Sequence, residues 1–328
     1  MPPSVDVAQL IAGVTAGDRA SIGRAITLVE SDAATHRQAA EQLLAELTVL
    51  GVDAQRIGVT GVPGVGKSTF IEFFGKQLTG RGHKVAVLAI DPSSAISGGS
   101  ILGDKTRMVE LSRDASAFIR PSPSAGSLGG VARKTREAIV VVEAAGYDVV
   151  LVETVGVGQS ETMVAEMVDF FLLLMLAGAG DSLQGIKRGV LELADLVAIN
   201  KADGDNLERA SRARVELESA LRYLPPVVEG WKVPVLTCSA LAEQGFDELW
   251  QCIEQHRVHT VTSGQRAVRR SSQQINWMWR TVEQALTERF RHDPRVATQL
   301  SLLEQTVRDG ELPATVAARR LLAAFLGD

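Results

Sequence analysis

The sequence predicts an α/β fold with a mostly parallel central sheet and helical extensions at both ends. Between residues 56 and 257, short apolar runs alternate with amphipathic segments, a pattern typical of βα units. The runs are rich in Val, Ile and Leu throughout, as expected where helices cover both faces of a sheet. The stretches before and after this region show only helical periodicity.

Six apolar runs are the expected strands: residues 57–60, 85–90, 149–153, 170–176, 196–200 and 233–237. Two stretches rich in Gly and Ser, residues 92–103 and 121–130, lie near the ends of expected strands. We interpret both as loops that respond to a bound phosphate, although ordinary long connections would have a similar composition.

Apolar residues at helical spacing mark the carboxy-terminal stretch. They are Ile275, Trp279, Val282, Leu286 and Phe290. Trp277 and Met278 point to other sides of the same helix, which therefore needs a second surface, either the sheet domain or another subunit. We expect an amino-terminal helical segment over residues 1–54, a nucleotide-binding domain over 55–262 and a carboxy-terminal helical segment over 263–328.

Composition narrows the class of protein. The chain has 328 residues, 45% of them hydrophobic, so it can bury a large core without disulfides or structural metal. Its formal net charge of -5 argues against nucleic acid as the main partner. Cys238 and Cys252 form neither a ligand cluster nor a disulfide framework and fit a reducing compartment.

The amino terminus lacks the basic start and apolar run of a signal peptide. The longest apolar run starts at Phe170 and fades at Gly178, which is too short to span a bilayer. We therefore expect a cytoplasmic protein with no membrane segment.

The strongest motif is a phosphate-binding loop between an expected strand and an expected helix. It consists of Gly61, Val62, Pro63, Gly64, Val65, Gly66, Lys67 and Ser68. Its glycines let backbone N–H groups converge on phosphate oxygens, and the following helix adds its positive end. Lys67 is expected to reach the β and γ phosphates, and the Ser68 hydroxyl to bind Mg²⁺. A glycine-rich turn without a nucleotide is the alternative. The motif predicts a P-loop NTPase fold.

A second motif predicts which base is bound. Asn200, Lys201, Ala202 and Asp203 end an expected strand and match the guanine motif N-K-x-D. The Asp203 carboxylate can accept hydrogen bonds from guanine N1–H and the exocyclic amine, and adenine lacks this donor pair. After the next expected strand, the residues that fit the loop behind the base are Ser239, Ala240 and Leu241.

Three acidic residues are expected near the metal and the attacking water. Asp91 ends the second expected strand, Asp104 follows a glycine-rich loop, and Glu153 ends the third expected strand. The carboxyl ends of parallel strands converge on a bound ligand. Glu153 opens a run that ends at Gly156, where many GTPases have D-x-x-G, so the Gly156 N–H is expected to sense the γ-phosphate. Helix caps or solvated loops are the alternative for each carboxylate, most of all for Asp104.

Taken together, these motifs resemble those of the MeaB/ArgK family of GTPases, the family of the methylmalonic aciduria type A protein. The matching segments are residues 61–69, 91–94, 98–108, 153–161, 178–189 and 200–203. The string at 98–108 is the most specific of them, and the resemblance covers the central domain and the helical flanks.

The resemblance implies a homodimer whose residues 263–328 make much of the dimer contact. It implies binding of GTP or GDP with Mg²⁺, slow hydrolysis, and a chaperone role toward the adenosylcobalamin enzyme methylmalonyl-CoA mutase, with gated cofactor loading. The residues that the resemblance assigns to phosphate and Mg²⁺ are Lys67, Ser68, Asp91, Asp104 and Glu153, and Thr69 belongs to the same loop. Asp181 and Lys187 would lie in a further loop that communicates with the mutase.

Two other classes of function have to be weighed. A small-molecule kinase, as the older ArgK label suggests, would usually bind adenine, which the motif at residues 200–203 argues against. A metal-inserting GTPase would need a Cys/His site, which Cys238 and Cys252 do not supply.

Overall fold

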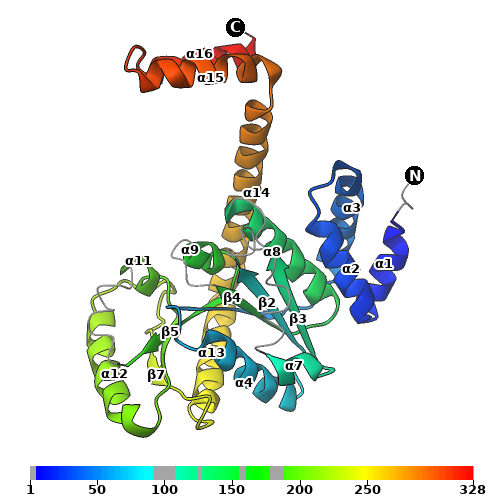
Figure 1. The fold of residues 1–328 in the computed structure, drawn as a ribbon. Helices are drawn as coiled ribbons and strands as arrows, with labels where there is room; N and C mark the ends of the chain where they lie inside the picture. Colours follow the sequence, from blue (N-terminus) through cyan, green and yellow to red (C-terminus); the bar gives the residue numbers. More distant parts are fainter. Residues whose placement is uncertain (1–4, 92–107, 124–127, 155–159, 178–187, 328) are drawn as a thin grey trace. The chain divides into compact units, whose positions relative to one another are not determined.

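A seven-stranded sheet lies at the centre of the fold (Figure 1). The computed structural model describes residues 5–91, 108–123, 128–154, 160–177 and 188–327. The strands are β1 (Gln55–Gly61), β2 (Val85–Asp91), β3 (Ala117–Pro123), β4 (Val149–Thr154), β5 (Phe170–Leu176), β6 (Leu196–Asn200) and β7 (Val235–Thr237). Their order is β3-β2-β4-β1-β5-β6-β7, and every neighbouring pair is parallel. The predicted α/β fold with a parallel sheet is confirmed.

Strand β3 was not predicted from the sequence. Our interpretation of residues 121–130 as a loop was wrong at both ends, because Pro121 and Pro123 belong to β3 and residues 128–130 begin a helix. Proline cannot donate to a strand ladder, which normally argues against a strand. Here β3 lies at the edge of the sheet and pairs only with β2, so one side of its backbone needs no partner strand. The other predicted loop, residues 92–103, lies outside the described residues.

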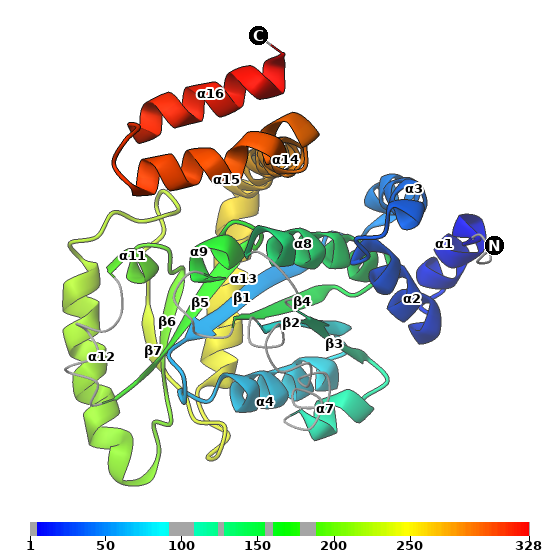
Figure 2. The same cartoon turned by 45° about the horizontal axis from the view of Figure 1, so that its top comes forward.

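Helices cover both faces of the sheet (Figures 1 and 2). One face is covered by α4 (Lys67–Gly80), α7 (Val109–Arg113) and α13 (Phe246–Thr262). The other is covered by α8 (Leu128–Ala144), α9 (Ser160–Ala165) and α12 (Leu207–Leu221). The short elements α11 (Arg188–Leu191) and η1 (Gly204–Asn206), a 3₁₀ turn, flank β6.

The helix after the phosphate loop is held by an aromatic cluster. Phe70 and Phe74 project from α4 one turn apart, and their ring centroids lie 5.5 Å from each other. The Phe246 ring at the start of α13 is 5.1 Å from Phe70. All three side chains are fully or almost fully buried, and each stabilises the fold by roughly 1.5–3 kcal/mol through burial of apolar area. The core therefore fixes α4 against the sheet.

The amino-terminal helices are α1 (Val7–Thr15), α2 (Arg19–Val29) and α3 (Ala34–Leu50), which pack on α8. Ion pairs add to this packing: Glu30 contacts Arg120 of β3 at 2.5 Å, and Asp32 contacts Lys134 of α8 at 2.8 Å. The predicted amino-terminal helical extension is therefore present, and it rests on the outer layer of the sheet domain.

The chain divides into two compact units, Met1–Arg270 and Ser271–Asp328. Helix α14 (Gln265–Arg291) begins in the first unit, and the second contains the rest of α14 with α15 (Pro294–Arg308) and α16 (Ala314–Leu326). Within the second unit, Phe290 packs against Phe325 with ring centroids 5.3 Å apart. Trp279 and Leu286, from the predicted apolar stripe, are more than half exposed. No described helix combines the length and apolar character needed to cross a membrane.

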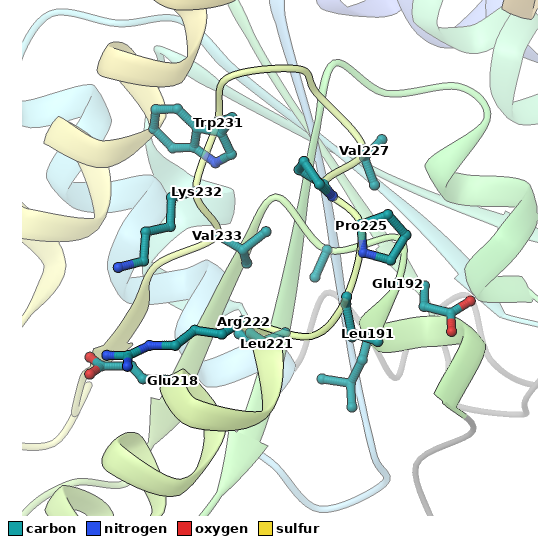
Figure 3. A pocket seen from close by; sticks show the side chains of 13 residues that line it. Leu191, Glu192, Glu218, Leu221, Arg222, Pro225, Val227, Trp231, Lys232 and Val233 are labelled. Atoms are coloured by element: carbon teal, nitrogen blue, oxygen red, sulfur yellow. The ribbon is translucent and has the colours of Figure 1, made fainter.

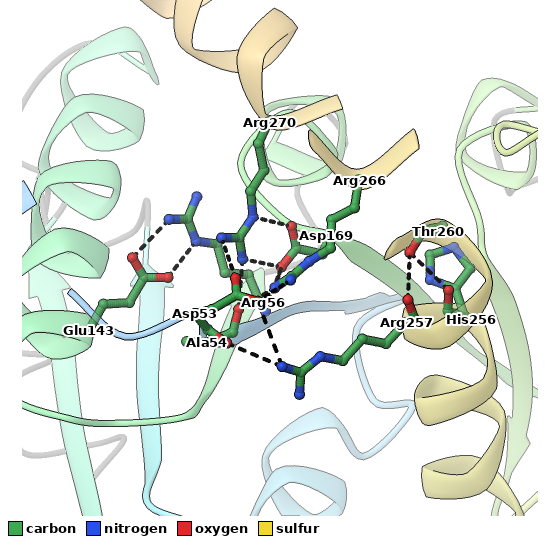
Figure 4. Close-up of polar contacts among 10 residues, drawn as sticks. All are labelled: Asp53, Ala54, Arg56, Glu143, Asp169, His256, Arg257, Thr260, Arg266 and Arg270. Carbon is green, nitrogen blue, oxygen red and sulfur yellow. Dashed lines mark hydrogen bonds and ion pairs between the residues drawn. The ribbon is translucent and has the colours of Figure 1, made fainter. Parts of the chain in front are cut away.

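A buried charge cluster joins the first turns of α14 to the amino ends of β1 and β5 (Figure 4). Arg270 contacts both carboxylate oxygens of Asp169, at 2.7 and 2.6 Å, and Arg266 lies 3.4 Å from Asp169. Burial by itself raises the pKa of Asp169, but hydrogen bonds from Arg270 and the charges of Arg270, Arg266 and Arg56 outweigh it and lower the pKa to about 2. Asp169 is therefore held as a carboxylate.

Candidate functional site

The predicted phosphate loop connects β1 to α4 at the carboxyl edge of the sheet. Gly61 has φ 156°, and a Cβ at this position would lie 2.5 Å from the carbonyl oxygen of Leu174 in β5. Gly66 has φ 93°, and a Cβ there would lie 3.1 Å from Asn200 Nδ2. Only glycine combines these backbone angles with such close neighbours. The loop is therefore packed against β5 and β6 at both of its ends.

Lys67, the first residue of α4, folds its ammonium back over the loop. Its Nζ donates to the carbonyl oxygens of Gly61 at 2.7 Å and Val62 at 3.3 Å. Burial lowers the pKa of Lys67, and the carboxylates of Glu153 and Glu161 oppose this shift. The ammonium is thus partly desolvated and held by weak neutral acceptors, which phosphate oxygens would replace with stronger charge-assisted bonds.

Ser68 and Glu153 meet where β4 lies beside β1. The Ser68 hydroxyl donates to Glu153 Oε1 at 3.1 Å, and Glu153, opposite Val59 in the strand register, is buried. A hydroxyl and a carboxylate are hard oxygen ligands of the kind that Mg²⁺ prefers, so these two residues fit the predicted metal site.

The other predicted residues near the phosphates are described only in part. Asp91 ends β2, which pairs with β4, so its backbone lies at the same sheet edge as Glu153, while its side chain is outside the described part. Asp104 and Gly156 lie outside the described residues, as do Asp181 and Lys187.

The guanine motif contacts the phosphate loop directly. Asn200, buried at the end of β6, donates from Nδ2 to the carbonyl oxygen of Val65 at 2.9 Å. Lys201 has φ 59°, and its Nζ donates to the carbonyl oxygen of Gly64 at 2.9 Å. The structure therefore brings together two motifs that are more than a hundred residues apart in the sequence.

Asp203, the residue expected to bind the guanine base, is hydrogen-bonded to Ser239. The buried Ser239 hydroxyl donates to an Asp203 carboxylate oxygen and also accepts the N–H of Ala242 at 3.0 Å. Of the other residues predicted in that loop, Ala240 is half-buried and Leu241 is exposed. Within the phosphate loop, Thr69 and Pro63 are exposed. Asp203 is thus oriented by Ser239, with carboxylate acceptor capacity remaining for a ligand.

Several residues near the site were not predicted from the sequence motifs. Glu161 is buried and acts electrostatically on Lys67, and it could have been noticed because it closes the string that starts at Glu153. The buried hydroxyl pair of Thr60 and Thr154, 2.8 Å apart, links β1 to β4 directly beneath the phosphate loop. No sequence signal distinguishes these threonines from ordinary strand residues.

A separate cavity of about 310 Å³ opens elsewhere on the sheet domain (Figure 3). Leu191, Leu221, Val227 and Trp231 contribute apolar walls, and Arg222 belongs to its polar lining. Among the described residues, none of those predicted to bind the nucleotide lines this cavity. Within the residues that the structure describes, no group of three or more His, Cys, Asp or Glu side chains is arranged to hold a metal ion.

Comparison with known proteins agrees with the motifs. The family model "Methylmalonyl Co-A mutase-associated GTPase MeaB" matches residues 22–295. A putative GTPase of Caulobacter vibrioides is 57% identical over 325 residues, which is 99% of each chain. The mitochondrial methylmalonic aciduria type A homolog of Mus musculus is 47% identical over 329 residues, covering 97% of this chain and 79% of that protein.

Among solved structures, that of an LAO/AO transport system kinase superposes over 100% of both chains with a TM-score of 0.80 and 38% identity. The family match covers most of the chain, and relatives of this similarity are named as GTPases. The predicted family and hydrolytic activity are thereby confirmed: the chain is a guanine-nucleotide-binding GTPase and belongs to the MeaB family of methylmalonyl-CoA mutase-associated GTPases.

Proposed function

We propose that this GTPase is a Mg²⁺-dependent chaperone of an adenosylcobalamin-dependent methylmalonyl-CoA mutase, which it protects and whose cofactor loading it gates. The observation that carries the nucleotide part is the direct contact between the two motifs, from Asn200 to Val65 and from Lys201 to Gly64. One nucleotide can therefore span both motifs, with its phosphates on the loop and its base at Asp203.

The residues of the site have separable roles in the proposed reaction. Backbone N–H groups of the loop and the amino end of α4 bind the phosphates, and Lys67 neutralises charge that develops on the transferred phosphoryl group. Asp203, oriented by Ser239, accepts from the guanine edge. Glu153 orients the attacking water or a metal-bound water, and the Gly156 N–H senses the γ-phosphate.

For the metal, we propose Ser68, Asp91, Asp104 and Glu153 as the residues that hold Mg²⁺ directly or through water. The ion would neutralise β- and γ-phosphate charge during hydrolysis. The contact between Ser68 and Glu153 supports this assignment, because it places two hard oxygen ligands 3.1 Å apart beside the loop.

The proposal that the mutase is the partner rests on the family description and on the similarity to the murine methylmalonic aciduria type A homolog. A chaperone that acts through a nucleotide cycle needs a client that binds one of its nucleotide states better than the other. Only such a difference in affinity lets the client shift the balance between the two conformations of the chaperone. We further propose that the protein is a homodimer, with residues 263–328 as the dimerisation segment. The exposed apolar stripe on α14 supports this role.

The test is a pull-down of the purified chain with a methylmalonyl-CoA mutase in GTP, in GDP and without nucleotide, followed by GTPase assays of the mixture. We expect nucleotide-dependent capture and faster hydrolysis in the presence of the mutase. Equal capture in all three conditions, together with unchanged hydrolysis, would contradict the chaperone role.

A second candidate is a kinase that acts on a small molecule, because the 38%-identical solved structure is that of a protein named as a transport system kinase. The two functions differ in where the phosphate goes. Hydrolysis releases inorganic phosphate in proportion to GDP, whereas a kinase forms GDP or ADP with no free phosphate unless its product is unstable. Measuring both products in one reaction decides between them.

A further inference from the structure

Two buried hydroxyl groups join the strand that leads into the phosphate loop to the strand that carries Glu153. Thr60 precedes Gly61 in β1, and Thr154 follows Glu153 at the end of β4. The Thr154 hydroxyl donates to the Thr60 hydroxyl at 2.8 Å, and both side chains are fully buried. The two strands lie side by side in the sheet (Figure 2). We call this pair the threonine link, because it crosses between the strands at their carboxyl ends.

The link lies where the backbone pairing of these two strands ends. In the described sheet, the register of β1 with β4 runs as far as Val59 opposite Glu153, and the threonines are one residue further along. Each threonine is still paired with the strand on its other side, β5 in one case and β2 in the other. The hydroxyl bond therefore continues the connection of β1 to β4 beyond their own backbone ladder.

The end of β4 is held from both faces of the sheet. Successive side chains of a strand point to opposite faces, so Thr154 and Glu153 do not share one. On the Glu153 face, α4 supplies the Ser68 hydroxyl at 3.1 Å. On the other face, α9 packs closely: a Cβ at Gly58, two residues before the threonine of β1, would lie 2.7 Å from Val164 Cγ1. The threonine link is thus the counterpart, under α9, of the contact between Ser68 and Glu153.

Each threonine is the sequence neighbour of a residue in the candidate site. Gly61, next to Thr60, offers its carbonyl oxygen to Lys67 Nζ at 2.7 Å. Glu153, next to Thr154, is the carboxylate that we propose to orient water. A shift of one strand end against the other would therefore change the distance between the Glu153 carboxylate and the residues that bind phosphate.

We propose that Thr60 and Thr154 are positioning residues for GTP hydrolysis: their bond fixes the end of β4 against the start of the phosphate loop, and so holds the Glu153 carboxylate in place relative to the bound phosphates. Neither hydroxyl touches nucleotide or metal in this role. The inference rests on the proposed function, in which Glu153 orients the attacking water or a metal-bound water.

The experiment measures steady-state GTP hydrolysis of the full-length chain, with GDP affinity and thermal melting as parallel readouts. Thr154→Val removes the donor and keeps the β-branched shape that suits a strand. We expect kcat to fall about ten-fold, which corresponds to about 1.4 kcal/mol, the size of one net hydrogen bond. The KM for GTP and the affinity for GDP should stay within about two-fold, because the contacts of the phosphate loop and of the guanine motif are unchanged. Thr154→Ser keeps the hydroxyl and should keep most of the turnover.

A double variant, Thr60→Val with Thr154→Val, separates positioning from stability. Each single substitution leaves the other hydroxyl buried without its partner and should lower the melting temperature, whereas the double variant removes both polar groups and should regain most of it. Its kcat should stay low, because the bond between the strands is still absent. Thr135→Val is the matched control: this buried hydroxyl donates to the Val131 carbonyl within α8 at 3.0 Å, so its loss should affect melting and leave kcat unchanged.

A double variant that regains kcat together with its melting temperature would overturn the positioning role, and so would wild-type kcat in both single variants. The role is equally overturned if Thr135→Val lowers kcat as much as Thr154→Val does. All three outcomes leave the proposed function intact. Full turnover in Glu153→Ala would instead contradict the proposed role of Glu153 and this inference together.

Discussion

The side-chain amide of Asn200 donates a hydrogen bond to the backbone carbonyl of Val65 at 2.9 Å, and both residues are buried. Asn200→Ala removes the donor and leaves a buried carbonyl without it, at a cost on the order of 1–3 kcal/mol. We expect affinity for GTP and for GDP to fall together by roughly ten-fold or more, measured by fluorescence titration. Asn206→Ala removes a similar amide bond to the exposed Lys201 carbonyl and is the control. Equal affinities in the two variants would contradict this role of Asn200.

Lys67→Ala should abolish most hydrolysis and leave the fold intact. The ammonium lies on the surface of the phosphate loop rather than in the apolar core, and its contacts are to two carbonyl oxygens. Loss of a group that stabilises transition-state charge typically lowers kcat on the order of 100-fold or more. Steady-state GTPase assays alongside thermal melting test this, with Lys84→Ala as an exposed control. Near-normal turnover in Lys67→Ala would contradict the proposed role of Lys67 in stabilising the transition state.

Asp169→Asn should destabilise the chain by about 3–5 kcal/mol, because it removes the buried carboxylate that pairs with Arg266 and Arg270 and leaves them only the exposed Asp53. Urea unfolding measures this loss, and Asp53→Asn, in the same cluster but largely exposed, should cost less. The pKa of Asp169 is lowered from 3.8 to about 2 in the folded state. Its contribution is therefore fully present above about pH 4 and is lost as the pH falls toward 2. If the urea concentration at half-unfolding is the same for Asp169→Asn as for the wild-type chain, the cluster does not stabilise the fold.

Truncation before Ser271 should give a monomer that still binds GTP. The described contacts of the nucleotide motifs lie within residues 1–270, whereas Ile275, Trp279 and Leu286 expose apolar side chains on α14. Light scattering of the truncated and full-length chains gives the oligomeric state. Ile275→Glu in the full chain places a charge on the stripe and should have the same effect. A truncated chain that remains a dimer would exclude this segment as the main interface.

Much of the fold could be predicted because the buried strands are continuous apolar runs. Each of the six predicted strands overlaps an observed one, and their carboxyl ends carry the predicted motifs. Strand β3 was missed because Pro121 and Pro123 signal a break in any local pattern. Its edge position, which makes those prolines tolerable, is a property of the sheet and has no local sequence signal.

The site shows the same division between local and non-local information. Motif spacing predicted Lys67, Ser68, Asn200 and Asp203 as site residues, because each belongs to a motif that is defined by its expected contacts with a nucleotide. It did not predict the threonine link between β1 and β4, or the bond from Asn200 to Val65. Those contacts depend on how β1, β4 and β6 pack, and no local motif encodes that packing.

Asp203→Asn tests most directly the claim that the chain binds a guanine nucleotide between the phosphate loop and residues 200–203. The measurement is a competition titration of GTP, ATP and XTP against a fluorescent guanine nucleotide. The wild-type chain should prefer GTP over ATP by on the order of 100-fold or more, because adenine leaves the Asp203 carboxylate unpaired. The introduced amide reverses the hydrogen-bond polarity at one of the two oxygen positions, so Asp203→Asn should lose affinity for GTP and gain relative affinity for XTP. Equal binding of ATP and GTP by the wild-type chain, or an unchanged order of preference in Asp203→Asn, would contradict the account.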